Sequence, residues 1–272
     1  MNFLSTVSQW LPLRAWALLG LLGVLAGCAG QPGLGDTPVE LHTASDDSAE
    51  RKRARPRLEL AAGYYGNGQY AVALDETKKA LQVDPTFPDA YNLGGLIYMA
   101  LGENQLARAH FERAIALNPR DANALHNLGW LQCQQGQYAA ATQSFERAVA
   151  VPLYGDRAKT LMTQGICEAR AGDKAKAEAT LQRSYELDAG NPVTGYNLSQ
   201  LLYQRGDYSR AQFYIRRLNN SELANAESLW LGVRIERRLN NRQAMEQLAA
   251  QLRRRFPQST ELQAYERGAF ND

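Results

Sequence analysis

Three histidines and three cysteines are the residues of this 272-residue chain best suited to ligate a metal or act as nucleophiles. His42 lies in a polar segment, and His110 is expected to be exposed on a helix. A structural zinc site needs four ligands, yet only His126 and Cys133 lie close together, seven residues apart. The chain lacks HExxH, GxSxG and phosphate-loop patterns. We therefore expect no catalytic residue, metal site, cofactor or small-molecule substrate, and predict that the chain is not an enzyme.

Cys28 differs from the other cysteines because it follows an apolar run near the N-terminus. Residues 15–26 (AWALLGLLGVLA) are apolar or glycine, and Arg14 is the single charged residue before them. Twelve residues are too few for a membrane-spanning helix, which needs about 20, but they suit the hydrophobic region of a secretory signal. A buried globular helix is the alternative, which is disfavoured because the segment that follows cannot pack as a domain.

The apolar run ends in Leu25-Ala26-Gly27-Cys28, which resembles the bacterial lipobox. The resemblance implies that residues 1–27 are a signal peptide and that Cys28 is lipidated, for example with palmitate. Two or three acyl chains anchor a protein stably. Ala29 follows the cysteine in place of an aspartate, and by resemblance to Gram-negative lipoproteins this implies an outer-membrane protein facing the periplasm.

Residues 28–55 are predicted to form the lipidated N-terminus and a flexible tether. They are rich in Gly, Pro, Ser, Asp and Arg, with few large apolar residues, so they cannot bury enough surface to offset their ordering entropy. The basic patch at 50–55 (ERKRAR) is interpreted as the solvated start of a helix, with contact to anionic headgroups as the alternative. Residues 56–272 are predicted to form the folded domain.

An internal repeat of about 34 residues occupies this domain. Six alanines recur with spacings of 34, 34, 36, 34 and 33 residues, and a glycine precedes each of the first five by five positions. The alanines are Ala73, Ala107, Ala141, Ala177, Ala211 and Ala244. A residue four positions after each alanine shares its helix face, so the alanine permits close helix approach and the larger residue fills the next groove. In the sixth unit Leu239 replaces the turn glycine, and Leu248 and Gln251 take the later positions.

Segments such as LNPRDANALHNLGWLQCQQGQYAAATQSFERAVAV resemble the tetratricopeptide repeat over residues 56–257. The resemblance implies an all-α fold, a right-handed superhelical solenoid of about six helix-turn-helix repeats, the last one capping. Either Gly94 or Gly95 holds the small position of the second repeat, which leaves its register open by one residue. The insert at 151–159 is expected to loosen the joint between repeats three and four.

In tetratricopeptide repeats the first helix of each pair lines a concave surface. When each repeat is numbered so that its recurring alanine is position 20, the residues that line the concave surface are at positions 5, 9 and 12. In the early repeats several of these residues are apolar. A partner-binding groove is therefore predicted at Leu58, Ala62, Tyr65, Leu96, Met99 and Trp130. An exposed apolar groove usually marks a partner site, and an amphipathic peptide suits it. The alternative is that long neighbouring side chains cover these residues.

Two further features complete the set of candidates. Cys133 and Cys167 are expected to be core thiols of neighbouring first helices, although the periplasm also permits a disulfide. An arginine-rich end (Arg234, Arg237, Arg238, Arg242, Arg253, Arg254 and Arg255) is interpreted as a solvated capping surface, with an acidic partner or inner-leaflet lipid as the alternative. The net charge of +2 argues against nucleic-acid binding.

The lipobox, the short tether, the six repeats, the insert and the terminal segment ESLWLGVRIERRLNNRQAMEQLAAQLRRRFPQS together resemble the PilF/PilW family of type IV pilus biogenesis lipoproteins. The resemblance implies a pilotin, a monomer that binds subunits of the pilus secretin and promotes their outer-membrane localisation and multimerisation, supporting twitching motility. The alternative is another outer-membrane repeat lipoprotein, a scaffold for β-barrel assembly or peptidoglycan-enzyme recruitment.

Overall fold

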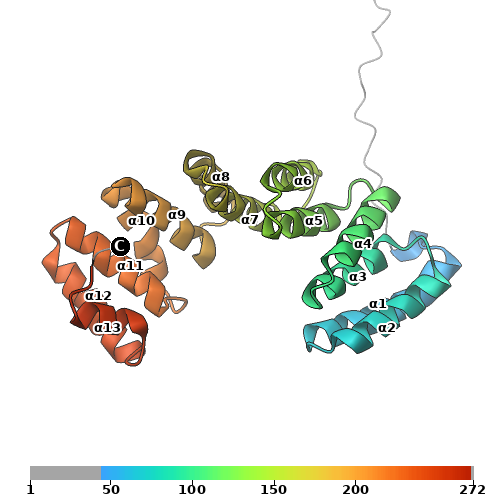
Figure 1. Ribbon diagram of the computed structural model, residues 1–272, viewed down its shortest axis with the longest axis horizontal. Helices are drawn as coiled ribbons and strands as arrows, with labels where there is room; N and C mark the ends of the chain where they lie inside the picture. Colours follow the sequence, from blue (N-terminus) through green and yellow to red (C-terminus); the bar gives the residue numbers. More distant parts are fainter. Residues whose placement is uncertain (1–43, 271–272) are drawn as a thin grey trace, which may run out of the picture. The chain divides into compact units, whose positions relative to one another are not determined.

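The computed structural model describes residues 44–270, which belong to two units (Figure 1). The unit Met1–Asp46 contains the short 3₁₀ helix η1 (Ala44–Asp46) among its described residues. The unit Asp47–Asp272 holds the α-helices of the described chain, α1 to α13. Cys28, the predicted signal peptide and most of the predicted tether lie outside the described residues.

The helices of the second unit form six consecutive pairs followed by one short helix. The first helices of the pairs are α1 (Ala49–Gly66), α3 (Pro88–Ala100), α5 (Ala122–Gln134), α7 (Arg157–Arg170), α9 (Pro192–Arg205) and α11 (Ala226–Arg238). The second helices are α2 (Tyr70–Val83), α4 (Asn104–Leu117), α6 (Tyr138–Ala150), α8 (Lys174–Leu187), α10 (Tyr208–Asn219) and α12 (Arg242–Arg255). The terminal helix α13 (Thr260–Glu266) packs on α11 and α12. No described helix has both the length and the apolar character needed to cross a membrane.

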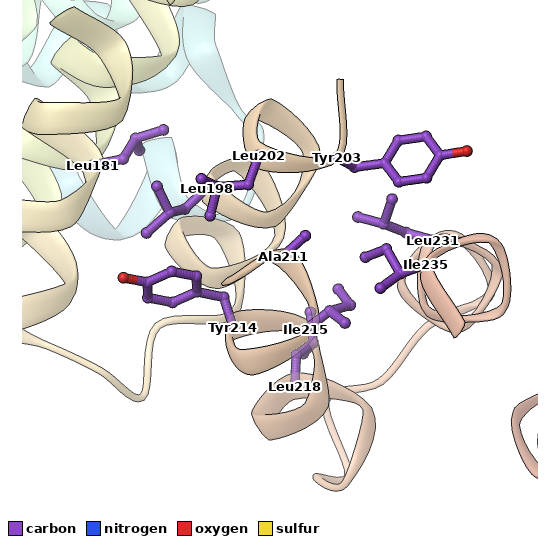
Figure 2. Close-up of a cluster of buried hydrophobic side chains, with 10 residues drawn as sticks. All are labelled: Leu181, Leu198, Leu202, Tyr203, Ala211, Tyr214, Ile215, Leu218, Leu231 and Ile235. Carbon is purple, nitrogen blue, oxygen red and sulfur yellow. The ribbon is translucent and has the colours of Figure 1, made fainter. Parts of the chain in front are cut away.

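Each helix packs mainly on the other member of its pair, and then on the next pair along the chain (Figure 1). Most of the core clusters combine side chains of two neighbouring pairs. The cluster in Figure 2 joins three pairs, with Leu181 from α8, Leu198 and Ile215 from α9 and α10, and Ile235 from α11. Because stability comes from such stacking of neighbours, the all-α solenoid of six helix pairs expected from the repeats is confirmed.

The contact between the two helices of a pair resolves the register of the second repeat. A side chain on Gly95 would meet the Phe111 ring at 2.4 Å. Gly129 stands in the same relation to Phe145, also sixteen residues later. Gly95 therefore holds the small position, and Gly94 is the neighbour that accommodates His110.

The sixth repeat is shifted by one residue from the predicted register. In the first five repeats the turn glycine has positive φ two residues before the second helix begins, and Asn240, with φ 58°, takes this place before α12. Asparagine reaches this left-handed conformation more readily than most other residues. Counted from Asn240, Met245 replaces Ala244 at the alanine position. Ala249 and Leu252 are accordingly buried, rather than the predicted Leu248 and Gln251, which are only partly buried.

The first helix begins at Ala49, seven residues before the predicted domain start at 56. Ser48 caps it by accepting a hydrogen bond from the Arg51 backbone N–H at 3.1 Å. Arg51 reaches the buried Asp84 at the end of α2 and stacks on the Phe87 ring, 4.4 Å from its centroid. Arg55 pairs with Asp47. The basic patch is thus the start of α1, and its arginines connect α1 to the next repeat rather than belonging to a tether.

Cys133 and Cys167 form a disulfide, so the expectation of two free thiols is wrong. Their Cα atoms lie 5.9 Å apart on α5 and α7, the first helices of repeats three and four. The insert at 151–159 is held at the same joint, since the Tyr154 hydroxyl lies 3.0 Å from Thr160 and Arg157 donates to the Val151 carbonyl at 2.8 Å. The joint that was expected to be loose is therefore tied by one covalent bond and two polar contacts.

Candidate protein-binding face of the first helices

The predicted groove residues lie on three consecutive first helices. Leu58, Ala62 and Tyr65 belong to α1, Leu96 and Met99 to α3, and Trp130 to α5. Ala62 is exposed, whereas the five larger side chains are partly buried. These side chains are therefore neither an open apolar groove nor fully covered by their neighbours. They keep some accessible surface, and neighbouring residues cover the rest.

Each of these larger side chains packs against residues of the next repeat. Leu58 and Tyr65 contact a cluster that includes Leu93 and Ile97 of α3. Leu96 and Met99 in turn contact a cluster that includes Leu128 and Leu131 of α5. The side chains thus lie in successive clusters, and none of them lines the cavities found among residues 154–270.

Among the predicted groove residues, Trp130 lies next to a charged side chain. Its indole packs beside the Cys133–Cys167 disulfide, and the Arg170 guanidinium of α7 lies over its ring, 5.1 Å from the centroid. An arginine in this position is attracted by the ring's negative face. Trp130 therefore contacts both an apolar cluster of the core and a cationic side chain of the next repeat.

A polar cluster lies beside Trp130 on the same first helix. His126 Nδ1 lies 2.9 Å from the Thr160 hydroxyl, which is also within hydrogen-bond distance of Tyr154. Burial lowers the pKa of His126 to about 4, so its imidazole is neutral at pH 7. His126 consequently serves as a neutral hydrogen-bonding residue between repeats three and four.

His110 is not exposed as predicted but partly buried against the preceding helix. Its ring lies 5.6 Å from the Tyr91 ring and 4.9 Å from the Tyr98 ring, measured between centroids. Burial lowers the pKa of His110. The space for the ring comes from Gly94, where a side chain would approach His110 Nδ1 to 2.4 Å. Among residues 44–270 there is no group of three or more His, Cys, Asp or Glu side chains placed to hold a metal ion.

The register shift in the sixth repeat changes which residues occupy its lining positions. The predicted register puts Leu229, Val233 and Glu236 there, and all three are buried. Counted from Asn240, positions 5, 9 and 12 are instead Trp230, Arg234 and Arg237, which retain accessible surface. The positive φ of Asn240 identifies this set, whereas the alanine spacing points to Ala244. The sequence did carry one signal, because an asparagine stands where the other repeats have their turn glycine.

Models of the tetratricopeptide repeat match residues 87–153 and 126–192 of the chain. The type IV pilus assembly protein PilF of Pseudomonas aeruginosa is 27% identical over 252 residues, which cover 92% of this chain and 97% of PilF. A solved structure from the functional characterisation of Pseudomonas aeruginosa PilF superimposes with a TM-score of 0.73 at 26% identity, covering 81% of this chain and all of the other.

The crystal structure of PilW, described as a widely conserved type IV pilus biogenesis factor, superimposes with a TM-score of 0.69. It is 30% identical and covers 79% of this chain, which spans 98% of PilW. The chain belongs to the PilF/PilW family. Membership of this family of tetratricopeptide-repeat proteins supports a role in type IV pilus biogenesis, and it makes the faces of the helix pairs candidates for protein–protein interaction.

Proposed function

We propose that the protein is a non-catalytic, monomeric outer-membrane lipoprotein that binds the type IV pilus secretin and promotes its outer-membrane localisation and multimerisation. The observation that carries the proposal is the likeness to PilF and PilW over nearly their whole lengths. Lipid on Cys28 anchors the protein, facing the periplasm. The repeat domain then presents its helix faces to secretin subunits that have crossed the inner membrane.

The proposed secretin-binding face is the early-repeat set Leu58, Ala62, Tyr65, Leu96, Met99 and Trp130. Five of these side chains are partly buried and apolar, so an apolar partner segment gains contact area without exposing the core. Ala62 is exposed on α1 among them. A small exposed residue at this point leaves room for a partner side chain, as in a helix that docks its apolar side into a groove.

The secretin assembly experiment tests the function as a whole. Membrane fractions are compared from a strain lacking the protein, a strain with Cys28→Ser and the parent. We expect loss of secretin multimers and of twitching motility in the deletion strain, and mislocalised secretin with Cys28→Ser. Normal multimers in the deletion strain contradict the proposal. Capture of β-barrel assembly proteins or peptidoglycan hydrolases without secretin favours the alternative scaffold role.

The binding face is tested with a matched pair of substitutions. Ala62→Arg adds a long charged side chain at an exposed position of α1, while Ala71→Arg makes the same change at an exposed position of α2. Both changes keep a good helix former, so both proteins are expected to fold. We expect Ala62→Arg alone to reduce copurification of secretin and its multimers. Equal copurification with both variants contradicts the assignment of this face, while leaving the anchoring role intact.

A further inference from the structure

A basic cavity lies at the last helix pair, far along the chain from the proposed secretin-binding face. Its volume is about 250 Å³. It is lined by Tyr203, Arg234, Arg237, Arg238, Asn240 and Phe270. Because ligand cavities usually start at about 300 Å³, it has room for one or two side chains rather than for a cofactor.

The three arginines of this cavity stand on one face of α11, at spacings of three and four residues. Like charges at this spacing on a helix repel one another. Aromatic rings hold the guanidinium groups in place: Arg237 lies 3.9 Å from the centroid of Phe270, Arg234 lies 5.0 Å from that of Tyr203, and Arg238 lies 5.9 Å from that of Tyr208. A guanidinium stacked on an aromatic ring can still donate hydrogen bonds, because its N–H groups point outward in the plane of the guanidinium itself.

Some other arginines of the domain form ion pairs within the fold. Arg51 pairs with Asp84, and both Arg205 and Arg210 pair with Glu178. Among the described residues no carboxylate lies within ion-pair distance of Arg237 or Arg238. These two guanidinium groups therefore present donors in a partly enclosed site without a described anionic partner.

The position of the cavity indicates what kind of anion it receives. Arg234 and Arg237 occupy lining positions 9 and 12 of the sixth repeat, and Tyr203 occupies position 12 of the fifth. In Figure 2 the Tyr203 ring extends from the core cluster on the same side as Leu231 of α11, with its hydroxyl directed away from the cluster. The site thus continues the face that the first helices present along the repeats.

We propose that this cavity binds the carboxylate side chains of an acidic peptide segment of a partner protein. An arginine guanidinium group can bind a carboxylate through two parallel N–H···O hydrogen bonds. Clusters of arginines commonly recognise acidic motifs in partner proteins. The Phe270 and Tyr203 rings add apolar surface for the stems and neighbouring residues of such a segment. A lipid surface instead favours basic side chains spread over an open face, whereas these are gathered in one cavity. The proposal does not depend on the identity of the partner in the proposed function.

The test is direct binding to the full chain purified in detergent. The probe is a fluorescein-labelled peptide of alternating glutamate and phenylalanine, and its fluorescence anisotropy is measured. A second peptide with glutamine in place of every glutamate reports on apolar binding alone. Arg237→Glu with Arg238→Glu is compared with Arg147→Glu and Arg183→Glu, which makes the same charge change at exposed positions of α6 and α8.

We expect the acidic probe to bind the parent chain, and the α11 double variant to bind it at least ~10-fold more weakly, because the change removes two guanidinium groups and places like charges opposite the probe's glutamates. The α6/α8 variant should keep parental affinity, and rising salt should weaken binding. Arg237→Gln with Arg238→Gln repeats the comparison without added negative charge, should the first variant unfold. Unchanged helical circular dichroism confirms folding.

Three results overturn the proposal. The first is absence of binding of the acidic probe to the parent chain, and the second is equal affinity of both double variants. The third is displacement of the probe by dihexanoylphosphatidylglycerol, a water-soluble anionic phospholipid, at lower concentration than by the unlabelled peptide, which assigns the cavity to a lipid headgroup.

Discussion

Gly95 of α3 faces Phe111 of α4 so closely that a methyl group added to Gly95 would lie 2.4 Å from the ring. The same relation recurs in the next repeat, where a methyl group on Gly129 would lie 2.9 Å from Phe145. The two phenylalanines are fully buried. The closest approach of the paired helices is therefore set by a glycine on the first helix and a large residue sixteen positions later on the second.

This contact predicts opposite effects for two glycine-to-alanine changes. Gly95→Ala should destabilise the domain by about 1–3 kcal/mol, since extra atoms in a packed core displace side chains or backbone. Gly63→Ala in α1 meets no atom within 4 Å and should stabilise by roughly 0.5–1 kcal/mol, because alanine is the better helix former. Urea unfolding of both variants measures the difference. If both changes stabilise, the register of the second repeat is wrong.

The alanine that follows the turn predicts a second paired comparison. Ala141 is fully buried and packs with Phe145 and Cys167, whereas Ala139, on the same helix, is exposed. Ala141→Trp should lower the free energy of unfolding by about 1–3 kcal/mol or more through overpacking. Ala139→Trp should change it by less than about 0.5 kcal/mol, as is usual for surface substitutions. Equal melting temperatures for the two variants contradict the packing described for α6.

The helix pairs could be predicted from the sequence because alanine and the preceding glycine recur at nearly fixed spacing, the glycine for the turn and the alanine for close helix packing. The last repeat escaped this argument because Asn240 takes the conformation that glycine takes elsewhere. The alanine spacing, which points to Ala244, therefore sets the sixth repeat one residue too early, whereas the structure puts Trp230, Arg234 and Arg237 at its lining positions. The basic patch was correctly interpreted as the start of a helix, but the domain boundary was set at 56 because the contacts of Arg51 with Asp84 and Phe87 cannot be inferred from the sequence.

The disulfide could not be assigned from the sequence either. Cys133 and Cys167 are 34 residues apart, close to the repeat length, so they fall on adjacent first helices. The spacing alone does not tell how far one helix is shifted along the other. That offset depends on the insert at 151–159, where Leu153 adopts positive φ, and it decides whether the two Cβ atoms face each other.

The disulfide predicts a measurable loss of stability on reduction. Closing a loop of this length removes chain entropy from the unfolded state worth about 4 kcal/mol in the loop-entropy treatment. Cys133→Ala with Cys167→Ala should therefore lower the melting temperature, and adding reductant should lower that of the parent but not of the variant. Alkylation of the Cys28→Ser chain under denaturing conditions should label no thiol without reductant and two with it. Two labelled thiols without reductant contradict the disulfide.

His126 predicts a pH dependence of stability. Burial lowers its pKa to about 4, while in the unfolded chain the imidazole titrates near its ordinary value of about 6.5. Between these values the unfolded state binds the additional proton, so stability falls as the pH decreases. The contribution is complete above pH 6.5 and is lost progressively down to pH 4, to a total of roughly 3 kcal/mol.

His126→Gln removes the titrating group while keeping a side chain able to hydrogen-bond to Thr160. The loss of unfolding free energy between pH 7.5 and pH 4.5 should then be smaller than in the parent by about 2 kcal/mol. Because His110 and Asp121 also have shifted pKa values, the difference between the variant and the parent, measured by urea unfolding, isolates His126. Parallel pH profiles for the two proteins contradict the buried, neutral imidazole.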